Sequence, residues 1–135
     1  MPRHLMIPVL ASVFCIPLVA NADTLTVCAS GCDYTSINAA IDDAQTGDVI
    51  QLSAETYTEG SVIDTDDKAI TIRGATDESG LPPSILDGND SHRVLQCVNG
   101  EGADTVFENL VIQNGYASGD YPDFAGGGML NINSS

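Results

Sequence analysis

The spacing of apolar positions changes from a helical period to short strand-like runs between residues 33 and 74. In the first part of this stretch, apolar residues recur at i, i+3, i+4 and i+7, which puts them on one face of an α-helix. The rest of the chain lacks this period, so the pattern predicts one short amphipathic helix. Its apolar stripe consists of Ile37, Ala40, Ile41 and Ala44.

The ends of this helix have recognisable capping residues. Thr35 or Ser36 is the expected N-cap, because a hydroxyl oxygen there can accept a hydrogen bond from a free backbone N–H of the first turn. Gly47 is the expected end, because glycine best tolerates the left-handed conformation just past a helix.

Seven short apolar runs follow the helix, separated by Gly, Asp and Thr, and no helix-period segment lies between them. A parallel sheet with helical crossovers is therefore excluded. Run starts recur at intervals near 20 residues, which favours the stacked coils of a solenoid, with the helix covering one open end. An antiparallel β-sandwich is the structural alternative. The runs are residues 49–52, 61–63, 69–74, 84–88, 94–98, 110–115 and 129–133.

The segment from residue 33 to 60 resembles the entry segment of right-handed parallel β-helix proteins of the pectin-lyase-like superfamily. Residues 69–74 resemble the next coil, and residues 107–119 and 125–135 resemble the repeats of polymorphic outer-membrane-type β-helices. Ala54 and Glu55 depart from the Pro-Gly pair of many relatives. The matching positions are Tyr34, Thr35, Ser36, Ile37, Ala39, Ala40, Ile41, Asp42, Gly47, Asp48, Ile50, Tyr57 and Glu59.

This resemblance implies an all-β fold, namely a right-handed parallel β-helix (solenoid) with a short N-terminal capping α-helix. We expect a signal peptide over residues 1–22, a cap containing the helix over residues 23–48, and the first coils of the β-helix over residues 49–135. At roughly 20 to 25 residues per coil the mature chain holds about four coils. The repeat is still running at Ser135, so we expect an N-terminal fragment of a longer protein.

The N-terminus has the features of a secretory signal. Arg3 and His4 precede an apolar run, and Ala20 and Ala22 flank Asn21 in an A-x-A-like cleavage site. A membrane anchor is disfavoured because the run is shorter than a bilayer span and contains two prolines. A lipoprotein is disfavoured as well, since bulky Phe14 precedes Cys15. We therefore expect a secreted, extracellular or cell-surface protein whose mature form starts at Asp23 and has no membrane-spanning segment.

The mature chain is strongly acidic. The full sequence has 4 basic and 19 acidic side chains, and loss of Arg3 leaves 3 minus 19, a formal charge of −16. Nucleic acid is excluded as a partner because phosphate binding needs Lys and Arg. Polysaccharide or cell-surface components are the expected partners.

Three cysteines remain in the mature chain. Cys28 and Cys32 can close the small CASGC loop as a disulfide in an oxidising environment. Metal binding by this pair is disfavoured because no second Cys pair or His cluster accompanies it. Cys97 lies in an apolar run and is expected to be a buried, inert thiol.

The sequence contains no catalytic signature of the β-helix enzymes, so no catalytic residue is assigned. The cationic candidates for lyase chemistry are Lys68, Arg73 and Arg93. Arg73 is instead expected to pair with a carboxylate. His92 is expected to be an ordinary loop residue. The glycines at residues 126–128 lack a phosphate-loop Lys and are expected to form a tight corner.

We expect no cofactor and assign no metal ligand. Three acidic patches leave Ca²⁺ as an alternative, but ordinary turn chemistry explains them equally well. These patches are residues 64–67, 87–90 and 119–123.

Two functions follow from these observations. The first is a secreted or cell-surface β-helix domain with a structural, adhesive or carbohydrate-binding role and no catalytic site in this segment. The second is the N-terminal part of a polysaccharide lyase or hydrolase acting on acidic polysaccharide, as in the pectate-lyase-like enzymes. Because a fold does not specify a function, fold resemblance alone leaves open whether the protein is an enzyme.

Overall fold

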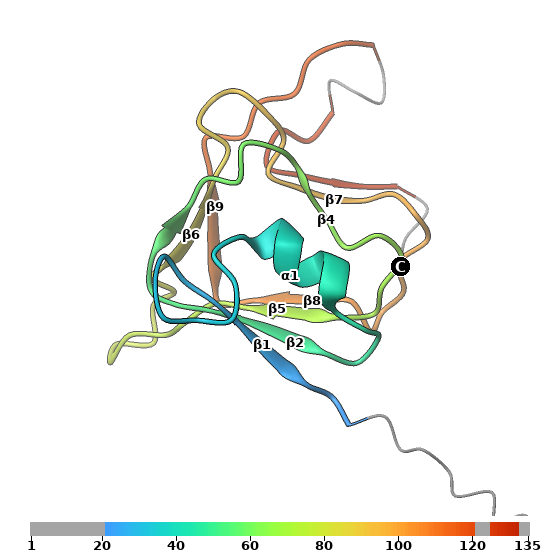
Figure 1. Ribbon diagram of the computed structural model, residues 1–135. Helices are drawn as coiled ribbons and strands as arrows, with labels where there is room; N and C mark the ends of the chain where they lie inside the picture. Colours follow the sequence, from blue (N-terminus) through green and yellow to red (C-terminus); the bar gives the residue numbers. More distant parts are fainter. Residues whose placement is uncertain (1–20, 121–124, 133–135) are drawn as a thin grey trace, which may run out of the picture.

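The computed structural model describes residues 21–120 and 125–132, which form three parallel β-sheets and one short helix (Figure 1). The first sheet has the order β1-β2-β5-β8, the second β3-β6-β9 and the third β4-β7-β10. The strands are β1 Thr24–Val27, β2 Val49–Leu52, β3 Thr56–Tyr57, β4 Ile63–Asp64, β5 Thr71–Arg73, β6 Ser84–Asp87, β7 Leu95–Cys97, β8 Val106–Glu108, β9 Leu110–Gln113 and β10 Met129–Asn131.

From β2 onward, consecutive strands enter the three sheets in rotation. We call each set of three a round: β2-β3-β4, β5-β6-β7 and β8-β9-β10. Each strand pairs with the strand at the same place in the next round, and all seven strand pairings among the described residues are parallel. An antiparallel sandwich is therefore wrong for this part of the chain.

The distance along the chain from one round to the next is not constant. Register partners in the first sheet are 25 residues apart from Thr24 to Val49, 22 from Val49 to Thr71 and 35 from Thr71 to Val106. The first two spacings agree with the estimate of roughly 20 to 25 residues per coil, and the third is longer because the connections between the strands of the second round are longer.

Aliphatic side chains stack in register through each sheet. Ile50 and Ile72 are partners in the first sheet, and both are fully buried. Tyr57 lies beside Leu86 in the second sheet, and Ile63 beside Leu95 in the third. Side chains from all three sheets and the helix belong to one hydrophobic cluster. The apolar runs therefore supply one shared core, and its burial is the main favourable term in folding.

The predicted helix is present as α1, Ile37–Asp43, and lies between the three sheets in the view of Figure 1. The N-cap is Ser36, whose side chain accepts a hydrogen bond from the Ala39 N–H. All four stripe residues, Ile37, Ala40, Ile41 and Ala44, are buried in the core cluster. The helix contacts β1, β2 and β4 and covers the apolar interior beside the first round.

Helix α1 ends at Asp43, earlier than the predicted end at Gly47. Ala44 is already extended, and Lys68 Nζ donates to the carbonyl oxygens of Ile41 and Asp42. Gly47 does adopt a positive φ of 100°, but in the turn that leads into β2. A cationic side chain from the next segment of chain therefore takes the place of the expected glycine cap.

The opposite end of α1 is held by Glu59. Its Oε1 accepts from the Ile37 N–H at 2.8 Å, and its Oε2 accepts from the Asn38 N–H at 3.1 Å and the Ser36 hydroxyl at 2.6 Å. Because the first N–H groups of a helix have no partner within the helix, one carboxylate here satisfies two of them. Glu59 and Lys68 thus fasten the two ends of α1 to the first round.

Two other positions of the resembling segment also have structural roles. The Tyr57 hydroxyl donates to Val27 O at 2.8 Å and accepts from the Ser53 N–H at 2.9 Å. The Asp48 carboxylate accepts from the backbone N–H groups of Asp23 and Gln45. The conspicuous polar residues of this segment therefore hold the cap and the first round together.

The sequence pattern missed β1, β3 and β8. Strand β3 contains two residues, too few for any periodic signal, and β1 lies in the segment assigned to the cap. Strand β8 is separated from β9 by the single residue Asn109, whose φ of 56° turns the chain from one sheet into the next. A corner made by one residue is invisible to a pattern based on hydrophobic period.

Glycines stand where two backbone segments approach closely, either between rounds, as at Gly74, or within one connection, as at Gly115 and Gly127. A Cβ on Gly74 would lie 1.9 Å from Asn109 O, and one on Gly115 would lie 2.1 Å from Gly127 O. A Cβ on Gly127 would in turn lie 2.7 Å from Gly115 O, and Gly126 has a positive φ of 61°. The corner predicted for residues 126–128 is confirmed at these two glycines.

The last round is less buried than the two before it. Ile112 and Met129 are each 38% exposed, whereas their register partners Leu86 and Leu95 are fully buried. These side chains are more exposed because, within the described residues, β8, β9 and β10 are the end strands of their sheets.

The signal peptide and Cys15 lie largely or wholly outside the described residues. No helix in the described part of the chain combines the length and the apolar character that a bilayer span requires.

Replacing Glu59 by Ala should lower the free energy of unfolding by about 2 kcal/mol, because two helix N–H groups lose their acceptor. Glu59→Gln keeps one acceptor oxygen and should cost about half as much. The measurement is urea unfolding followed by circular dichroism. Exposed Glu78 provides the matched control, since Glu78→Ala removes the same charge without touching the helix. Equal effects at the two positions would contradict the capping role.

Replacing Gly74 by Ala should destabilise the fold by about 3 kcal/mol, because the added methyl would overlap the Asn109 carbonyl. Gly102→Ala is the control, since a Cβ at Gly102 meets no atom within 4 Å and its φ is not positive. It should leave stability unchanged or raise it by up to ~1 kcal/mol. Chemical unfolding of both variants tests the difference, and a Gly74→Ala protein as stable as the parent would refute the close approach.

Candidate functional site

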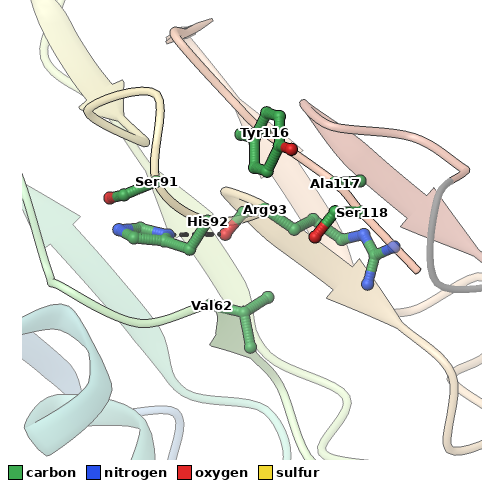
Figure 2. A pocket seen from close by; sticks show the side chains of 7 residues that line it. All are labelled: Val62, Ser91, His92, Arg93, Tyr116, Ala117 and Ser118. Carbon is green, nitrogen blue, oxygen red and sulfur yellow. Dashed lines mark hydrogen bonds between the residues drawn. The ribbon is translucent and has the colours of Figure 1, made fainter.

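A pocket of about 320 Å³ lies where the chain passes from the second sheet to the third (Figure 2). It is lined by the equivalent connections of three successive rounds, which precede β4, β7 and β10. Figure 2 shows these connections one above another. The stacking of rounds therefore creates the pocket, because residues far apart in sequence occupy the same corner. The lining residues are Val62, Ser91, His92, Arg93, Tyr116, Ala117 and Ser118.

His92 has one ring nitrogen engaged and one without a partner. Its Nδ1 lies 2.8 Å from Arg93 O, and since a carbonyl oxygen only accepts, Nδ1 carries the proton of this hydrogen bond. In the neutral ring Nε2 is then an acceptor. This atom is buried and has no hydrogen-bond partner among the described residues. Such an orphaned group is uncommon in a folded protein and is a candidate for ligand contact.

Arg93 lines the pocket, but its guanidinium group is directed at the backbone of the next round. Its Nε donates to Gly126 O at 3.0 Å and its Nη2 to Ala125 O at 2.8 Å. In Figure 2 the guanidinium lies at the side of the pocket remote from the His92 ring. Arg93 therefore ties successive rounds together.

Tyr116 places an aromatic ring at the upper rim of the pocket in Figure 2. The side chain is 52% exposed, and its backbone N–H donates to His92 O at 2.9 Å. The hydroxyl groups of Ser91 and Ser118 lie on either side of the pocket. The site thus combines one exposed aromatic face with several uncharged polar groups.

The other two cationic candidates are not brought to this pocket. Lys68 holds the C-terminal end of α1, and Arg73 forms an ion pair with Glu108 in the first sheet. The expectation that Arg73 pairs with a carboxylate is confirmed. The structure gathers none of the expected lyase groups around one point, and no catalytic residue is assigned.

Two of the three acidic patches form turns of the same design. Asp64 Oδ1 accepts from the Asp66 N–H at 2.9 Å, and Asp87 Oδ1 accepts from the Asn89 N–H at 2.7 Å. In each turn two consecutive residues have positive φ, at positions 66–67 and 89–90. Aspartate and asparagine tolerate this conformation and support such turns through their side chains.

The strand-end aspartates of these turns are also joined to the next round. Asp64 Oδ2 accepts from Gln96 Nε2 at 2.6 Å, and Asp87 Oδ2 accepts from Gln113 Nε2 at 2.8 Å. The described residues contain no group of three or more His, Cys, Asp or Glu side chains placed to hold a metal ion. Part of the third patch, residues 119–123, lies outside the described residues.

The cysteines are arranged as expected. Cys28 and Cys32 form a disulfide, with their Cα atoms 5.6 Å apart. Cys97 is buried and belongs to no disulfide in the described part of the chain. Burial raises the pKa of the Cys97 thiol, and the nearby Glu101 carboxylate adds to this effect. The thiolate is disfavoured, which is typical of an inert structural cysteine.

Sequence reasoning treated His92 as a loop residue and did not single out Tyr116. The two residues are 24 positions apart and share no motif, so nothing in the linear pattern joins them. The available signal was an aromatic residue after Asn-Gly in one connection and a histidine after Asp-Ser in another. Their proximity becomes visible only when the rounds are in register.

No family model matches the chain, and neither a curated protein nor a solved structure matches it.

The hydrogen bond from Gln113 Nε2 to the Asp87 carboxylate yields a testable prediction. Hydrogen bonds from Gln113, then from the Asn89 N–H and Asn114, lower the pKa of Asp87 below its ordinary value. Gln113→Leu should therefore raise that pKa, as measured by carboxyl ¹³C NMR titration. Gln51→Leu, a change in the first sheet, is the control and should leave it unchanged.

The lowered pKa of Asp87 determines how the stability of the fold changes with pH. A lowered pKa stabilises the fold above the ordinary value and loses that contribution as the pH falls through the folded-state pKa. The stability difference between the parent and Gln113→Leu should thus be largest above about pH 4 and shrink in more acidic solution. A difference that grows as the pH falls would contradict this assignment.

Proposed function

We propose that the chain forms the first coils of a right-handed parallel β-helix on an exported protein, with a structural, adhesive or carbohydrate-binding role at the cell surface or outside the cell. The observation that carries this proposal is the rotation of strands through three parallel sheets, which lines up equivalent corners of successive rounds. A right-handed path is the rule for parallel crossover connections. Each round would then be one coil.

The corner pocket supports a binding role along this surface. Extended repeat proteins use surfaces built from equivalent positions of neighbouring repeats. The pocket lined by Val62, His92 and Tyr116 is such a surface, since each of these residues comes from a different round. A ligand lying there would contact all three rounds, as a polymer chain does more readily than a small molecule.

The engagement of the basic side chains favours binding over catalysis. Lys68, Arg73 and Arg93 all make structural contacts, so none of them is placed to stabilise charge on a reacting uronate. A lyase would need such a group beside a base at one point. A noncatalytic role is therefore the better-supported function for this segment.

The incompletely buried last round fits the same architecture. Ile112 and Met129 form part of its interior layer and remain 38% exposed. In a parallel β-helix this is the surface on which another coil stacks, because a coil buries its interior against its neighbours.

The proposal predicts that the protein binds polysaccharide without cleaving it. Affinity electrophoresis through gels containing neutral or acidic polysaccharide should show retarded migration of the parent protein. Incubation with polygalacturonate or alginate, with and without Ca²⁺, should release neither reducing ends nor unsaturated products. Absence of retardation in every gel would contradict carbohydrate binding, and product release would contradict the noncatalytic role.

A further inference from the structure

We propose that the corner pocket binds a neutral, hydroxyl-rich saccharide. One sugar hydroxyl donates to His92 Nε2, and an apolar face of a sugar ring lies against Tyr116. This inference rests on the carbohydrate-binding role proposed above and names both the ligand class and the contacting side chains.

His92 provides the specific hydrogen bond. The hydrogen bond from Nδ1 to Arg93 O fixes the proton on that nitrogen, so the neutral ring presents Nε2 as an acceptor. This acceptor has no partner among the described residues and is closed to solvent, so a ligand contacts it when the ring or the pocket rim shifts. A buried polar atom without a partner costs free energy, and a ligand that supplies a donor recovers that cost on binding. Hydroxyl groups are donors of this kind, whereas carboxylates only accept.

Tyr116 provides the apolar contact. Its side chain is 52% exposed at the rim of a concave site, and its backbone is held there by the hydrogen bond to His92 O. Aromatic rings offer large, rigid contact areas that combine an apolar body with a polar edge. Pyranose rings have the matching combination, with C–H groups on their faces and hydroxyls at their edges.

The electrostatics favour a neutral ligand over a uronate. Arg93, the cationic side chain of the pocket, already donates to Ala125 O and Gly126 O. The chain as a whole carries 19 acidic side chains against 4 basic ones, so its field repels an acidic polymer. A uronate carboxylate would also be left without a donor from His92. The pocket therefore selects against the acidic substrates of the enzymes that the sequence resembles.

The size of the pocket agrees with this ligand class. A volume of about 320 Å³ falls at the lower end of the range for small-ligand sites, enough for a sugar ring and part of its neighbour. The hydroxyls of Ser91 and Ser118 flank the space between His92 and Tyr116. The Ser91 hydroxyl donates to Gly88 O at 3.0 Å and can therefore accept from a sugar hydroxyl, whereas the Ser118 hydroxyl can donate or accept.

The test uses the full chain and a panel of hexasaccharides. Neutral cellohexaose, xylohexaose and mannohexaose are compared with hexagalacturonate by isothermal calorimetry and by ¹⁵N NMR of the His92 ring. We expect at least one neutral oligosaccharide to bind, with a shift of the Nε2 resonance, and hexagalacturonate to bind at least tenfold more weakly. A tighter complex with hexagalacturonate, or binding that leaves the Nε2 resonance in place, would overturn the inference.

Variants separate the two contacts. His92→Phe removes the acceptor and Tyr116→Ala removes the ring, and each should weaken binding of the neutral oligosaccharide about tenfold. Tyr116→Phe keeps the ring and should bind like the parent. Leu81→Ala removes another exposed apolar side chain, 64% exposed and absent from the pocket lining, and serves as the control. Because Tyr116 is exposed, its variants test the site even if His92→Phe fails to fold.

The outcomes distinguish this inference from the proposed function. If neutral polysaccharide retards the protein but the His92 and Tyr116 variants bind like the parent, carbohydrate binding stands and this pocket is wrong as its site. If no saccharide binds at any site, both fail. Loss of binding in Tyr116→Ala with retention in Tyr116→Phe supports the pocket.

Discussion

The fastening of helix α1 across the first round is the constraint on which the rest of the structure depends. A stack of parallel strands leaves its apolar interior open at both ends, and here one end is covered by a helix of seven residues. Such a short helix is marginal by itself. Glu59 at its N-terminus and Lys68 at its C-terminus supply charges that match the helix dipole and the groups it leaves unpaired. Closure of the interior and stability of the helix therefore depend on the same contacts.

The outer faces of the sheets repeat the same principle of joining one round to the next through polar side chains. Gln96 donates to Asp64 and Gln113 to Asp87, and Arg73 pairs with Glu108. In a chain with so few cations, amide donors provide most of these links. Each of these aspartate carboxylates lies beside an amide, and not beside another carboxylate, on the adjacent strand. This arrangement limits the repulsion that a large negative charge would otherwise cause. Acidity here is compatible with stacking because Asp64 and Asp87 each lie beside a glutamine of the next round.

The candidate site is a consequence of this stacking. Val62, His92 and Tyr116 come from three separate connections between the second and third sheets. Because these connections lie at the same corner of successive rounds, the three residues line one pocket. Polar residues of the segment that carries the family resemblance, such as Tyr57 and Glu59, hold the scaffold. The inference of saccharide binding therefore rests on residues that carry no motif. A repeat architecture makes this arrangement natural, because any corner position can become part of a surface shared by several rounds.

The sequence by itself determined the helix, an N-cap at Thr35 or Ser36, seven of the ten strands, the glycine corner and the acidic turns, because each depends on local spacing or on the preference of a residue for its own backbone conformation. It also indicated parallel stacking through a resemblance. The tertiary structure alone decided the register, the lengths of the rounds, the role of Lys68 as a helix cap and the meeting of His92 with Tyr116. These features depend on which segments lie side by side, and loops of different length between strands hide that from any linear period.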